Sequence, residues 1–375
     1  MGNSLNYSYE QLKRFCEDAF PKFGYTKEEA KVITDVLLLA DLYGIESHGT
    51  QRLVRYYKDI VRGLIKVDAK PEVVFETPVS AVIDGHDGIG QLIGEYANNL
   101  AIEKAKKTGI AVVVVRNSTH YGIAGYYAKK ACDQGLIGIS TTNTTAIMVP
   151  TYGRKALLGT NPVAIACPAE PYPFFFDAAT TVVTRGKLEV YNKLDKPLHE
   201  GWAIDSTGKG STDAAKVLGC IANAEGGGIL PLGGETEDSG SHKGYGWAMF
   251  AELFSSILSL GTTSDMTNIG GKGGICHGFI VIDPKIFGNA DAIKDHFSEY
   301  LEKLRNSPKA EGQSRIYTHG EKEIEAMADR MKNGINVNKN TVAEMRDLAE
   351  YLKMDVVDYL GEEALKIEGK KSIYG

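Results

Sequence analysis

The sequence Ile110-Ala111-Val112-Val113-Val114-Val115-Arg116-Asn117-Ser118-Thr119-His120-Tyr121-Gly122 joins an unbroken apolar run to a loop of small and hydroxyl residues around one histidine. A short run of apolar residues such as Ile110 to Val115 is typical of a buried strand. Functional side chains often lie on the loop that follows a strand, and an imidazole titrates near neutral pH. The stretch therefore predicts a core strand that carries His120 to a site of acid/base chemistry.

A second histidine lies in a similar setting, Ser47-His48-Gly49, with Arg52 shortly after it. Arginine supplies a fixed cation with a planar fork of donors, and glycine lets a ligand approach the backbone closely. This combination suits acid/base chemistry on an anion. Most histidines are ordinary surface or core residues, and we interpret six of the eight in that way. His48 itself could simply start the helix that carries Arg52.

Composition limits the class of protein. The chain has 375 residues, 43% of them hydrophobic and 24% charged, with 42 glycines, which describes a globular protein long enough for two domains. The net charge of −6 and the absence of a basic run argue against a nucleic-acid partner.

Cysteine usage and hydropathy predict the compartment. The five cysteines are far apart and odd in number, which suits free thiols in a reducing compartment. The N-terminal sequence lacks a signal-peptide pattern, and no run approaches the roughly 18 apolar residues of a membrane span. We therefore expect a cytoplasmic protein with no membrane partner.

The pattern along the chain predicts helices at both ends and strands between them. Ser8 with Gln11 and Thr26 with Glu29 have capping-box spacing, and a further helix is expected between His48 and Gly63. Helices are also expected at about 91–107, 246–260, 291–305 and 340–353. Strands are expected at 73–75, 81–83, 110–115, 137–139, 163–165, 174–176 and 279–282. Two glycine-rich loops, 201–211 and 223–244, are long enough to be functional or mobile.

The segment Gly88-Ile89-Gly90-Gln91-Leu92-Ile93-Gly94 has the layout of a dinucleotide-binding turn, because it follows a predicted strand and opens a helix that leads to a second strand. Its spacing is G-x-G-x-x-x-G, however, instead of G-x-G-x-x-G. The second strand also ends in Arg116-Asn117 where the NAD-binding form has an acidic residue. We interpret the segment as an ordinary glycine-rich turn.

Three further segments have both a plain and a functional interpretation. Gly159-Thr160-Asn161-Pro162 is a standard turn sequence, yet an asparagine amide and a threonine hydroxyl also suit a carboxamide such as that of nicotinamide. Asp177 could be a helix cap or could accept hydrogen bonds from ribose hydroxyls. Lys243, at the start of a predicted helix, could be a solvated lysine or part of a phosphate site.

Taken together, these segments resemble the malate/L-lactate dehydrogenase family, which includes ureidoglycolate, sulfolactate and 2,3-diketogulonate oxidoreductases and is distinct from the Rossmann-type lactate and malate dehydrogenases. The resemblance spans residues 44 to 246, and the matching segments occur in the family's order. They are 44–49 with Arg52 and Tyr56, 118–127, 159–162, 176–187, 230–234 and 241–246. Thr318-His319-Gly320-Glu321 departs from the family, whose members usually have proline before the glycine.

The resemblance implies an α+β fold without a Rossmann turn. A helical domain would be formed from both chain ends, residues 1–75 with 296–375, and residues 76–295 would form a mostly antiparallel-sheet domain that binds NAD or NADP. It also implies a homodimer with active sites in the cleft between domains.

By position, the resemblance makes His120 the catalytic acid/base and places His48, Arg52 and Tyr56 on the substrate side, with His48 also counted as catalytic. The residues that it assigns to the cofactor are Thr144, Thr160, Asn161, Pro162, Asp177, Ala178, Ala179 and Lys243. No metal is implied.

The expected reaction is reversible oxidation of a small 2-hydroxy acid. His120 would take the hydroxyl proton while C2 gives a hydride to the nicotinamide, and Arg52 would clamp the C1 carboxylate. Malate is the first choice of substrate, followed by lactate, sulfolactate or a ureido acid such as ureidoglycolate. The second cation that a dicarboxylate needs could be Arg185 or Lys187, and the preference between NAD and NADP stays open.

Two other classes of function fit some of the same residues. A metal hydrolase built on His48 and His120 would need a third ligand, and the sequence lacks His-x-x-x-His and His-Glu-x-x-His spacing. A non-catalytic nucleotide-binding module would bind a nucleotide without consuming it.

Overall fold

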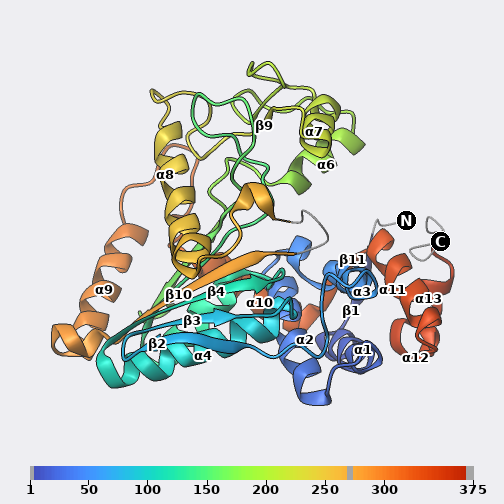
Figure 1. The fold of residues 1–375 in the computed structure, drawn as a ribbon, viewed down its shortest axis with the longest axis horizontal. Helices are drawn as coiled ribbons and strands as arrows, with labels where there is room; N and C mark the ends of the chain where they lie inside the picture. Colours follow the sequence, from blue (N-terminus) through green and yellow to red (C-terminus); the bar gives the residue numbers. More distant parts are fainter. Residues whose placement is uncertain (1–3, 268–272, 369–375) are drawn as a thin grey trace.

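The structure is a computed structural model that describes residues 4–267 and 273–368. Within those residues the chain is a mixed α/β protein with 13 α-helices and one large sheet of seven strands. Figure 1 shows the sheet in the lower half, helices of both chain ends beside it and a separate group of helices and loops above it. No helix of the described residues is long and apolar enough to cross a membrane.

The central sheet has the strand order β2-β3-β4-β10-β5-β6-β7. Only the pair β3 and β4 is parallel, and every other neighbouring pair is antiparallel. All seven predicted strands are confirmed, as is the mostly antiparallel sheet. The strands are β2 (Glu72–Thr77), β3 (Ser80–Asp84), β4 (Ile110–Ser118), β5 (Ile137–Thr142), β6 (Val163–Cys167), β7 (Phe174–Ala178) and β10 (Ile275–Ile282).

Two helices cover one face of this sheet, α4 (Gly90–Thr108) and α5 (Ala124–Cys132). The buried apolar cluster between them and the sheet includes Ala101 of α4, Val113 of β4 and Tyr127 of α5. On the other face lies α8 (Ser241–Glu252), which continues as a π-helical turn, Leu253–Ile257 (Figure 1).

The predicted turn before α4 is real, but protein atoms fill the space where a dinucleotide phosphate would lie. The backbone N–H of Gly90 donates to Thr119 Oγ1 at 2.9 Å, and Thr119 Oγ1 donates to the carbonyl of Gly88 at 3.0 Å. A Cβ on Gly90 would lie 2.3 Å from the Thr119 carbonyl oxygen. The glycines therefore allow the loop of His120 to pack on the start of α4, and the interpretation as an ordinary turn agrees with this geometry.

The two ends of the chain meet in one helical unit. Strands β1 (Ser4–Tyr7) and β11 (Ile335–Asn338) pair with each other, and one apolar cluster combines side chains from both ends, such as Phe15 and Leu348. Both capping boxes, at Ser8 and at Thr26, are present as predicted. The helices are α1 (Tyr9–Lys22), α2 (Lys27–Leu42), α3 (Leu53–Val61), α11 (Lys339–Tyr351), α12 (Val356–Leu360) and α13 (Glu362–Leu365).

A smaller apolar cluster organises the segment above the sheet in Figure 1. It contains Leu188 of α6 (Arg185–Lys193), Val217 of α7 (Ala214–Asn223) and Ile229 of β9 (Gly228–Ile229), which pairs with β8 (Ala203–Ile204). Helices α6 and α7 were not predicted, and each of the two glycine-rich loops contains one of these two-residue strands.

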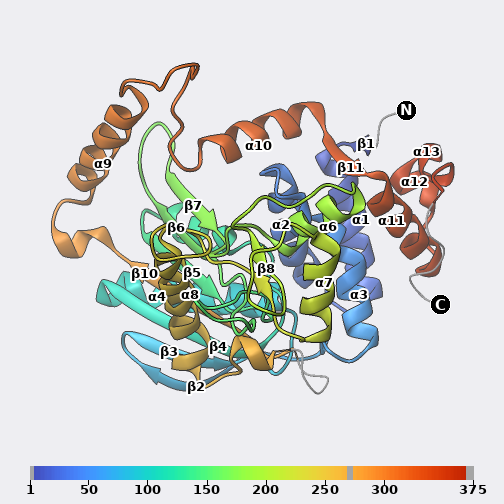
Figure 2. The same ribbon diagram turned by 90° about the horizontal axis from the view of Figure 1, so that it is seen from above.

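Helices α9 (Ala290–Arg305) and α10 (Glu321–Asn333) are joined by a long connection that Figure 2 shows running outside the body of the molecule. Helix α9 lies beside β7, where the rings of Phe297 and Phe174 are 5.7 Å apart. The predicted domain boundary at residue 296 falls inside α9, and the division into two domains stays a prediction.

Candidate active site

Short turns place the first histidine and the arginine. The chain between α2 and α3 forms two 3₁₀ turns, Glu46–His48 and Thr50–Arg52. The buried carboxylate of Asp41 accepts a hydrogen bond from the Thr50 N–H at 2.8 Å, and a Cβ on Gly49 would lie 1.9 Å from Asp41 Oδ1. Glycine at position 49 is therefore required by the packing on Asp41, and this packing holds His48 and Arg52 on one side of the loop.

Arg52 and His48 are both anchored by Ser47. Arg52 Nε donates to the Ser47 carbonyl at 2.6 Å, and Ser47 Oγ lies 2.9 Å from His48 Nδ1. Because Nε is engaged, the terminal nitrogens of the Arg52 fork are the groups with which it would grip a carboxylate.

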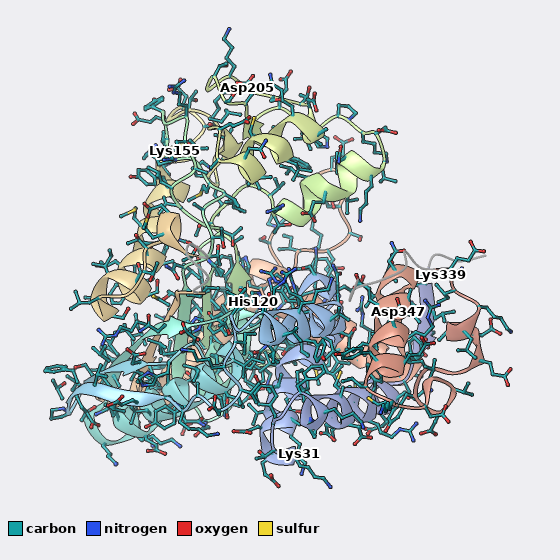
Figure 3. The ribbon with its side chains drawn as sticks, turned by 45° about the vertical axis from the view of Figure 1, so that its right-hand side comes forward. Lys31, His120, Lys155, Asp205, Lys339 and Asp347 are labelled. Atoms are coloured by element: carbon teal, nitrogen blue, oxygen red, sulfur yellow. The ribbon has the colours of Figure 1, made fainter. Side chains whose placement is uncertain are left out.

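His120 lies just beyond the end of β4, near the centre of the molecule (Figure 3). Its ring stacks on that of His48, with centroids 5.4 Å apart and an angle of 28° between the planes. The Tyr56 hydroxyl lies 2.8 Å from His120 Nδ1, and the Gly122 N–H points to the same nitrogen at 3.3 Å. The structure thus brings His48, Tyr56 and His120 together, and a tyrosine hydroxyl can partner Nδ1 whether or not that nitrogen carries a proton.

The surroundings favour the neutral form of both imidazoles. Burial and the nearby charges of Arg52 and Arg55 lower the pKa of His48 to about 3. Burial, followed by Arg52, His48, Arg55 and His277, lowers the pKa of His120 well below its usual value. An anion bound to Arg52 would offset the positive charge that Arg52 exerts on His120, so a carboxylate ligand should raise the pKa of His120.

A third histidine, His277 on β10, links the loop of His120 to the neighbouring strand. Its Nε2 lies 2.8 Å from Ser118 Oγ, and its Nδ1 lies 2.9 Å from Thr142 Oγ1. The ring is fully buried and stacks on Tyr121, with centroids 4.1 Å apart. Burial lowers the pKa of His277 to about 3, so this histidine is a neutral structural bridge.

Beyond that bridge, the predicted cofactor residues of two loops form one hydrogen-bonded cluster. Thr144 N–H donates to Asn161 Oδ1 at 3.1 Å, and the Thr160 N–H donates to Thr144 Oγ1 at 2.9 Å. Thr180 adds two bonds, from its N–H and its Oγ1, to the carbonyl of Thr160. Thr144 and Thr160 are half-buried, whereas Asn161 is fully buried.

The other cofactor candidates lie near this cluster in sequence or at a helix start. Pro162 leads into β6, and Ala178 ends β7 opposite Val163. Asp177 Oδ2 accepts the Gly125 N–H at 2.7 Å, so the carboxylate caps the first turn of α5. Burial raises the pKa of Asp177 to about 6. Ala179 follows β7 and is half-buried.

Lys243 is exposed in the first turn of α8. Within the described part of the chain no side chain caps this helix, whose N-cap is Gly240. An uncapped helix start beside a lysine suits a phosphate group. Among the described residues, no hydrogen bond or ion pair joins Lys243 to His48 or His120, and the role predicted for it stays a prediction.

Two buried polar residues near these groups were not predicted. Gln91, in the first turn of α4, is fully buried, and in the described structure neither atom of its amide has a hydrogen bond of standard geometry. The amide nevertheless lies close enough to Tyr56 to lower the pKa of its hydroxyl, which burial raises to about 12 overall. Glu252, at the end of α8, contacts Asn161. The sequence places both in helices, where neither has a motif to distinguish it.

Potential metal ligands do not gather in the structure. Among residues 4–267 and 273–368, no three His, Cys, Asp or Glu side chains could hold an ion together.

Comparison with known proteins gives a consistent picture. The model of the malate/L-lactate dehydrogenase family matches residues 7–346. The malate dehydrogenase of Pyrococcus horikoshii is 43% identical over 350 residues, which cover 93% of this chain and 96% of that protein. The L-sulfolactate dehydrogenase of Methanocaldococcus jannaschii is 39% identical and covers 94% of this chain and 98% of its own length. A crystal structure of malate dehydrogenase from Entamoeba histolytica superposes with a TM-score of 0.90 at 37% identity, covering 94% of this chain and 99% of that one.

Fold, site and comparisons define the class as a malate dehydrogenase-like 2-hydroxyacid dehydrogenase that lacks the Rossmann turn. The predicted resemblance is therefore confirmed. The chain belongs to the malate/L-lactate dehydrogenase family of NAD(P)-dependent oxidoreductases.

Proposed function

We propose that this protein interconverts malate and oxaloacetate with NAD or NADP, and that His120 is its acid/base. The observation that carries the proposal is the group formed by His120, His48 and Tyr56, with Arg52 close enough to lower the pKa of both imidazoles. When bound, a nicotinamide would supply the acceptor for the hydride from C2 of the hydroxy acid. The His120 imidazole would take the hydroxyl proton at Nε2 in the tautomer whose Nδ1–H donates to the Tyr56 hydroxyl 2.8 Å away, and this contact fixes the ring.

Arg52 supplies the charge that selects an acid as substrate. Its two terminal nitrogens would bind the C1 carboxylate end-on, because Nε is held by Ser47. A carboxylate fixed in this way presents C2 and its oxygen in one orientation to His120. The stacked ring of His48 forms the neighbouring wall and is neutral at physiological pH.

The residues on the cofactor side fit a nicotinamide dinucleotide. Thr144 and Thr160 offer hydroxyl groups of a rigid, bonded cluster, and the start of α8 with Lys243 offers a cation and backbone donors for a phosphate. We propose that the Thr144, Thr160–Pro162 and Asp177–Ala179 segments line the nicotinamide and ribose portion.

A spectrophotometric screen tests the reaction. We expect oxidation of NADH or NADPH with oxaloacetate, and weaker turnover with pyruvate, sulfopyruvate or oxalurate, the 2-oxo acids matching lactate, sulfolactate and ureidoglycolate. A stronger response to sulfopyruvate would move the assignment toward sulfolactate, which is the substrate named for the Methanocaldococcus relative. Binding of a dinucleotide without turnover of any acid would support a nucleotide-binding module instead.

His120→Ala tests the acid/base within the same assay. We expect turnover to fall about 10²–10⁴-fold, the usual contribution of a general acid/base. Cofactor binding, measured by titration calorimetry, should persist because no predicted cofactor residue depends on the imidazole. Near-normal turnover would overturn the role given to His120.

We further propose that the chain forms a homodimer. Helix α8 and the segment after it expose an apolar stripe, whose members Trp247, Leu253, Ile257 and Leu260 are between 43% and 86% exposed. Such a stripe on the surface of a single chain favours burial against a second copy. Sedimentation analysis would contradict the proposal by finding only monomers at micromolar concentration.

A further inference from the structure

We propose that Glu252 is a positioning residue that holds the Thr144 and Thr160–Pro162 loops in the shape that binds the dinucleotide. The inference rests on the proposed function, because it assumes that these loops bind a cofactor. It assigns a role to a buried carboxylate that lies outside the histidine group.

Glu252 is a buried carboxyl group surrounded by donors. Its side chain is 3% exposed. Oε2 accepts from Asn161 Nδ2 at 2.7 Å and from Ser264 Oγ at 2.6 Å. Oε1 accepts from the Ser264 N–H at 2.9 Å and from Ser256 Oγ at 2.8 Å, and Asn143 Nδ2 is 3.5 Å away. A carboxylate is the one side chain that accepts at every position, so it suits a site in which each of these partners donates.

The bond to Asn161 determines which way the Asn161 amide faces. Since Nδ2 donates to Glu252, Oδ1 is directed at the Thr144 N–H and accepts it at 3.1 Å. Thr144 Oγ1 in turn accepts the Thr160 N–H at 2.9 Å. The carboxylate therefore acts through the asparagine amide on both loops that carry the predicted cofactor residues.

The backbone of Asn161 has an uncommon conformation. Its φ angle is +34°, in the left-handed region, which asparagine adopts more readily than other residues apart from glycine. Asn161 is fully buried with its amide engaged by Glu252, Thr144 and the Ala248 carbonyl. The amide of Asn161 is thus hydrogen-bonded within the protein and fixes the turn. Thr160 and Pro162 on either side of it are half-buried.

The helix that carries Glu252 is locked against the sheet. The π-helical turn Leu253–Ile257 follows directly, and widened turns of this kind are frequent at functional sites. The carbonyl oxygen of Phe254 would lie 1.7 Å from a Cβ at Gly278 of β10, so only glycine at position 278 permits this close approach. Glu252 therefore has little freedom to follow a loop that moves away from it.

Glu252→Gln tests this arrangement. Glutamine has the same shape as glutamate, but its NH₂ group would face the NH₂ group of Asn161, and both are donors. The Asn161 amide must therefore flip so that its oxygen accepts the hydrogen bond from the glutamine. That reversal directs the Asn161 NH₂ at the Thr144 N–H, so the bond between the loops is lost. We expect the Kd for NADH or NADPH, measured by titration calorimetry, to rise about tenfold or more, in line with loss of a bond to a charged group. The KM for the 2-oxo acid should change less than twofold.

A reciprocal exchange separates this role from a general structural one. In the double variant Glu252→Gln with Asn161→Asp, the aspartate accepts both the Thr144 N–H and the glutamine NH₂, and only the longer bond to the Ala248 carbonyl is lost. We expect it to recover much of the cofactor affinity lost in the single variant. Glu103→Gln on the exposed side of α4 makes the same change of charge and should leave cofactor binding unaltered.

The outcomes distinguish this inference from the proposed function. Wild-type protein that binds neither dinucleotide would overturn both. Wild-type binding together with an unchanged Kd in a folded Glu252→Gln variant would overturn this inference alone, as would equal losses of cofactor and acid binding without rescue by the exchange. If Glu252→Gln does not fold, Ser264→Ala removes the hydroxyl that lies 2.6 Å from Glu252 Oε2 and 3.2 Å from Asn161 Oδ1, and it keeps the Ser264 N–H bond to Glu252. That variant should weaken cofactor binding several-fold, and an unchanged Kd there would also contradict the role.

Discussion

At the scale of single residues, the site is organised around the protonation of His120. Burial and positive neighbours keep its pKa well below the usual value, so the ligand-free imidazole is neutral at pH 7. A neutral imidazole is ready to act as a base in oxidation. Reduction needs the protonated form, which an acid bound to Arg52 would favour by offsetting the arginine charge.

The dependence of the rates on pH follows from this shift. For oxidation we expect kcat/KM to stay level as the pH falls through about 6.5, the ordinary histidine pKa, because protonation of His120 occurs only at lower pH. For reduction, kcat/KM should fall as the pH rises, since the protonated fraction of the free enzyme declines. Initial rates in both directions across the pH range would measure this. A loss of oxidation with a midpoint near 6.5 would contradict the assignment.

Arg52→Lys tests the carboxylate clamp. Lysine is a point cation without the planar fork, so it cannot donate to the Ser47 carbonyl and at the same time bind an acid through two parallel hydrogen bonds. We expect KM for the acid to rise about tenfold to a hundredfold, as for loss of one charged hydrogen bond, with a smaller change in kcat. Arg55→Lys in the first turn of α3, just after Arg52, is the matched control and should leave KM unaltered. The clamp would be refuted by an unchanged KM in the Arg52 variant.

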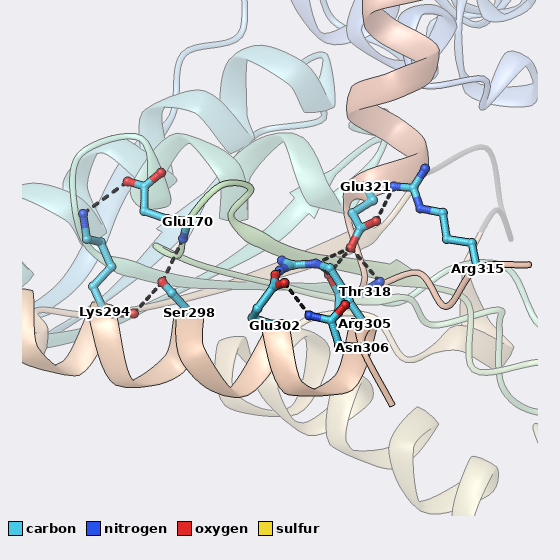
Figure 4. A network of polar contacts seen from close by, with 9 residues as sticks. All are labelled: Glu170, Lys294, Ser298, Glu302, Arg305, Asn306, Arg315, Thr318 and Glu321. Carbon is cyan, nitrogen blue, oxygen red and sulfur yellow. Dashed lines mark hydrogen bonds and ion pairs between the residues drawn. The ribbon is translucent and has the colours of Figure 1, made fainter. Parts of the chain in front are cut away.

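At the scale of elements, a buried ion cluster ties the connection between α9 and α10 to the sheet edge (Figure 4). Glu321 has a side chain 1% exposed and pairs with Arg305 at 2.7 Å and Arg315 at 2.6 Å. The Thr318 N–H donates to it at 2.9 Å. The carbonyl of His319, the residue after Thr318, accepts the Phe175 N–H of β7, so the cluster holds the connection beside the strand that carries Asp177. The Thr318-His319-Gly320-Glu321 segment, which departs from the family pattern, therefore fixes this connection against the sheet.

Glu321→Gln should destabilise the fold in a pH-dependent way. Burial alone would raise the pKa of Glu321, but bonds from Thr318, Arg305 and Arg315 outweigh it and lower the pKa to about 2. The ionised form therefore stabilises the fold above the unfolded pKa, and that contribution is lost as the pH falls towards 2. Near pH 7 we expect a loss of about 3 kcal/mol of unfolding free energy.

Denaturant unfolding of both proteins near pH 7 and near pH 3 would measure the difference, which should shrink in acid. Glu325→Gln is the control, because its bond to Arg315 lies on the surface, where such pairs contribute about 0–1 kcal/mol. A constant difference at all pH values would show that the carboxylate charge is not what stabilises the cluster.

At the scale of the whole molecule, the two chain ends share one apolar core beneath the substrate side of the site. Phe15 and Phe20 of α1 lie in the same buried cluster as Leu53 and Tyr56 of α3 and Leu348 of α11. Tyr56 contacts both this core and His120. The position of the Tyr56 hydroxyl therefore depends on helices that are separated by nearly the whole sequence.

Leu348→Ala should loosen both chain ends together. Truncation of a fully buried leucine costs about 2–5 kcal/mol, and one shared core means that amide hydrogen exchange should accelerate in α1 as well as in α11. Leu365→Ala in α13, where the side chain is 51% exposed, should cost less than about 0.5 kcal/mol. Unchanged protection of α1 in the Leu348 variant would contradict a shared core.

Local patterns were enough to predict the features that arise within a few residues of each other. The capping boxes at Ser8 and Thr26 and the seven strands follow from hydrogen bonds and side-chain periodicity inside short segments. Helices α6 and α7 were missed because they are only nine and ten residues long and α7 lies between the two glycine-rich segments. The β1–β11 pair was missed as well, because its two strands are short and more than 300 residues apart.

The family and the residues that carry the chemistry could be deduced from the order of the motifs alone, because residue types and their order along the chain do not depend on folding. Only the tertiary structure decided how those groups meet. It stacks His48 on His120 across 71 intervening positions, turns the Asn161 amide towards Glu252, and fills the start of α4 with Thr119 in place of a phosphate. Contacts of this kind depend on the packing of distant elements, and a one-dimensional pattern carries no record of that packing.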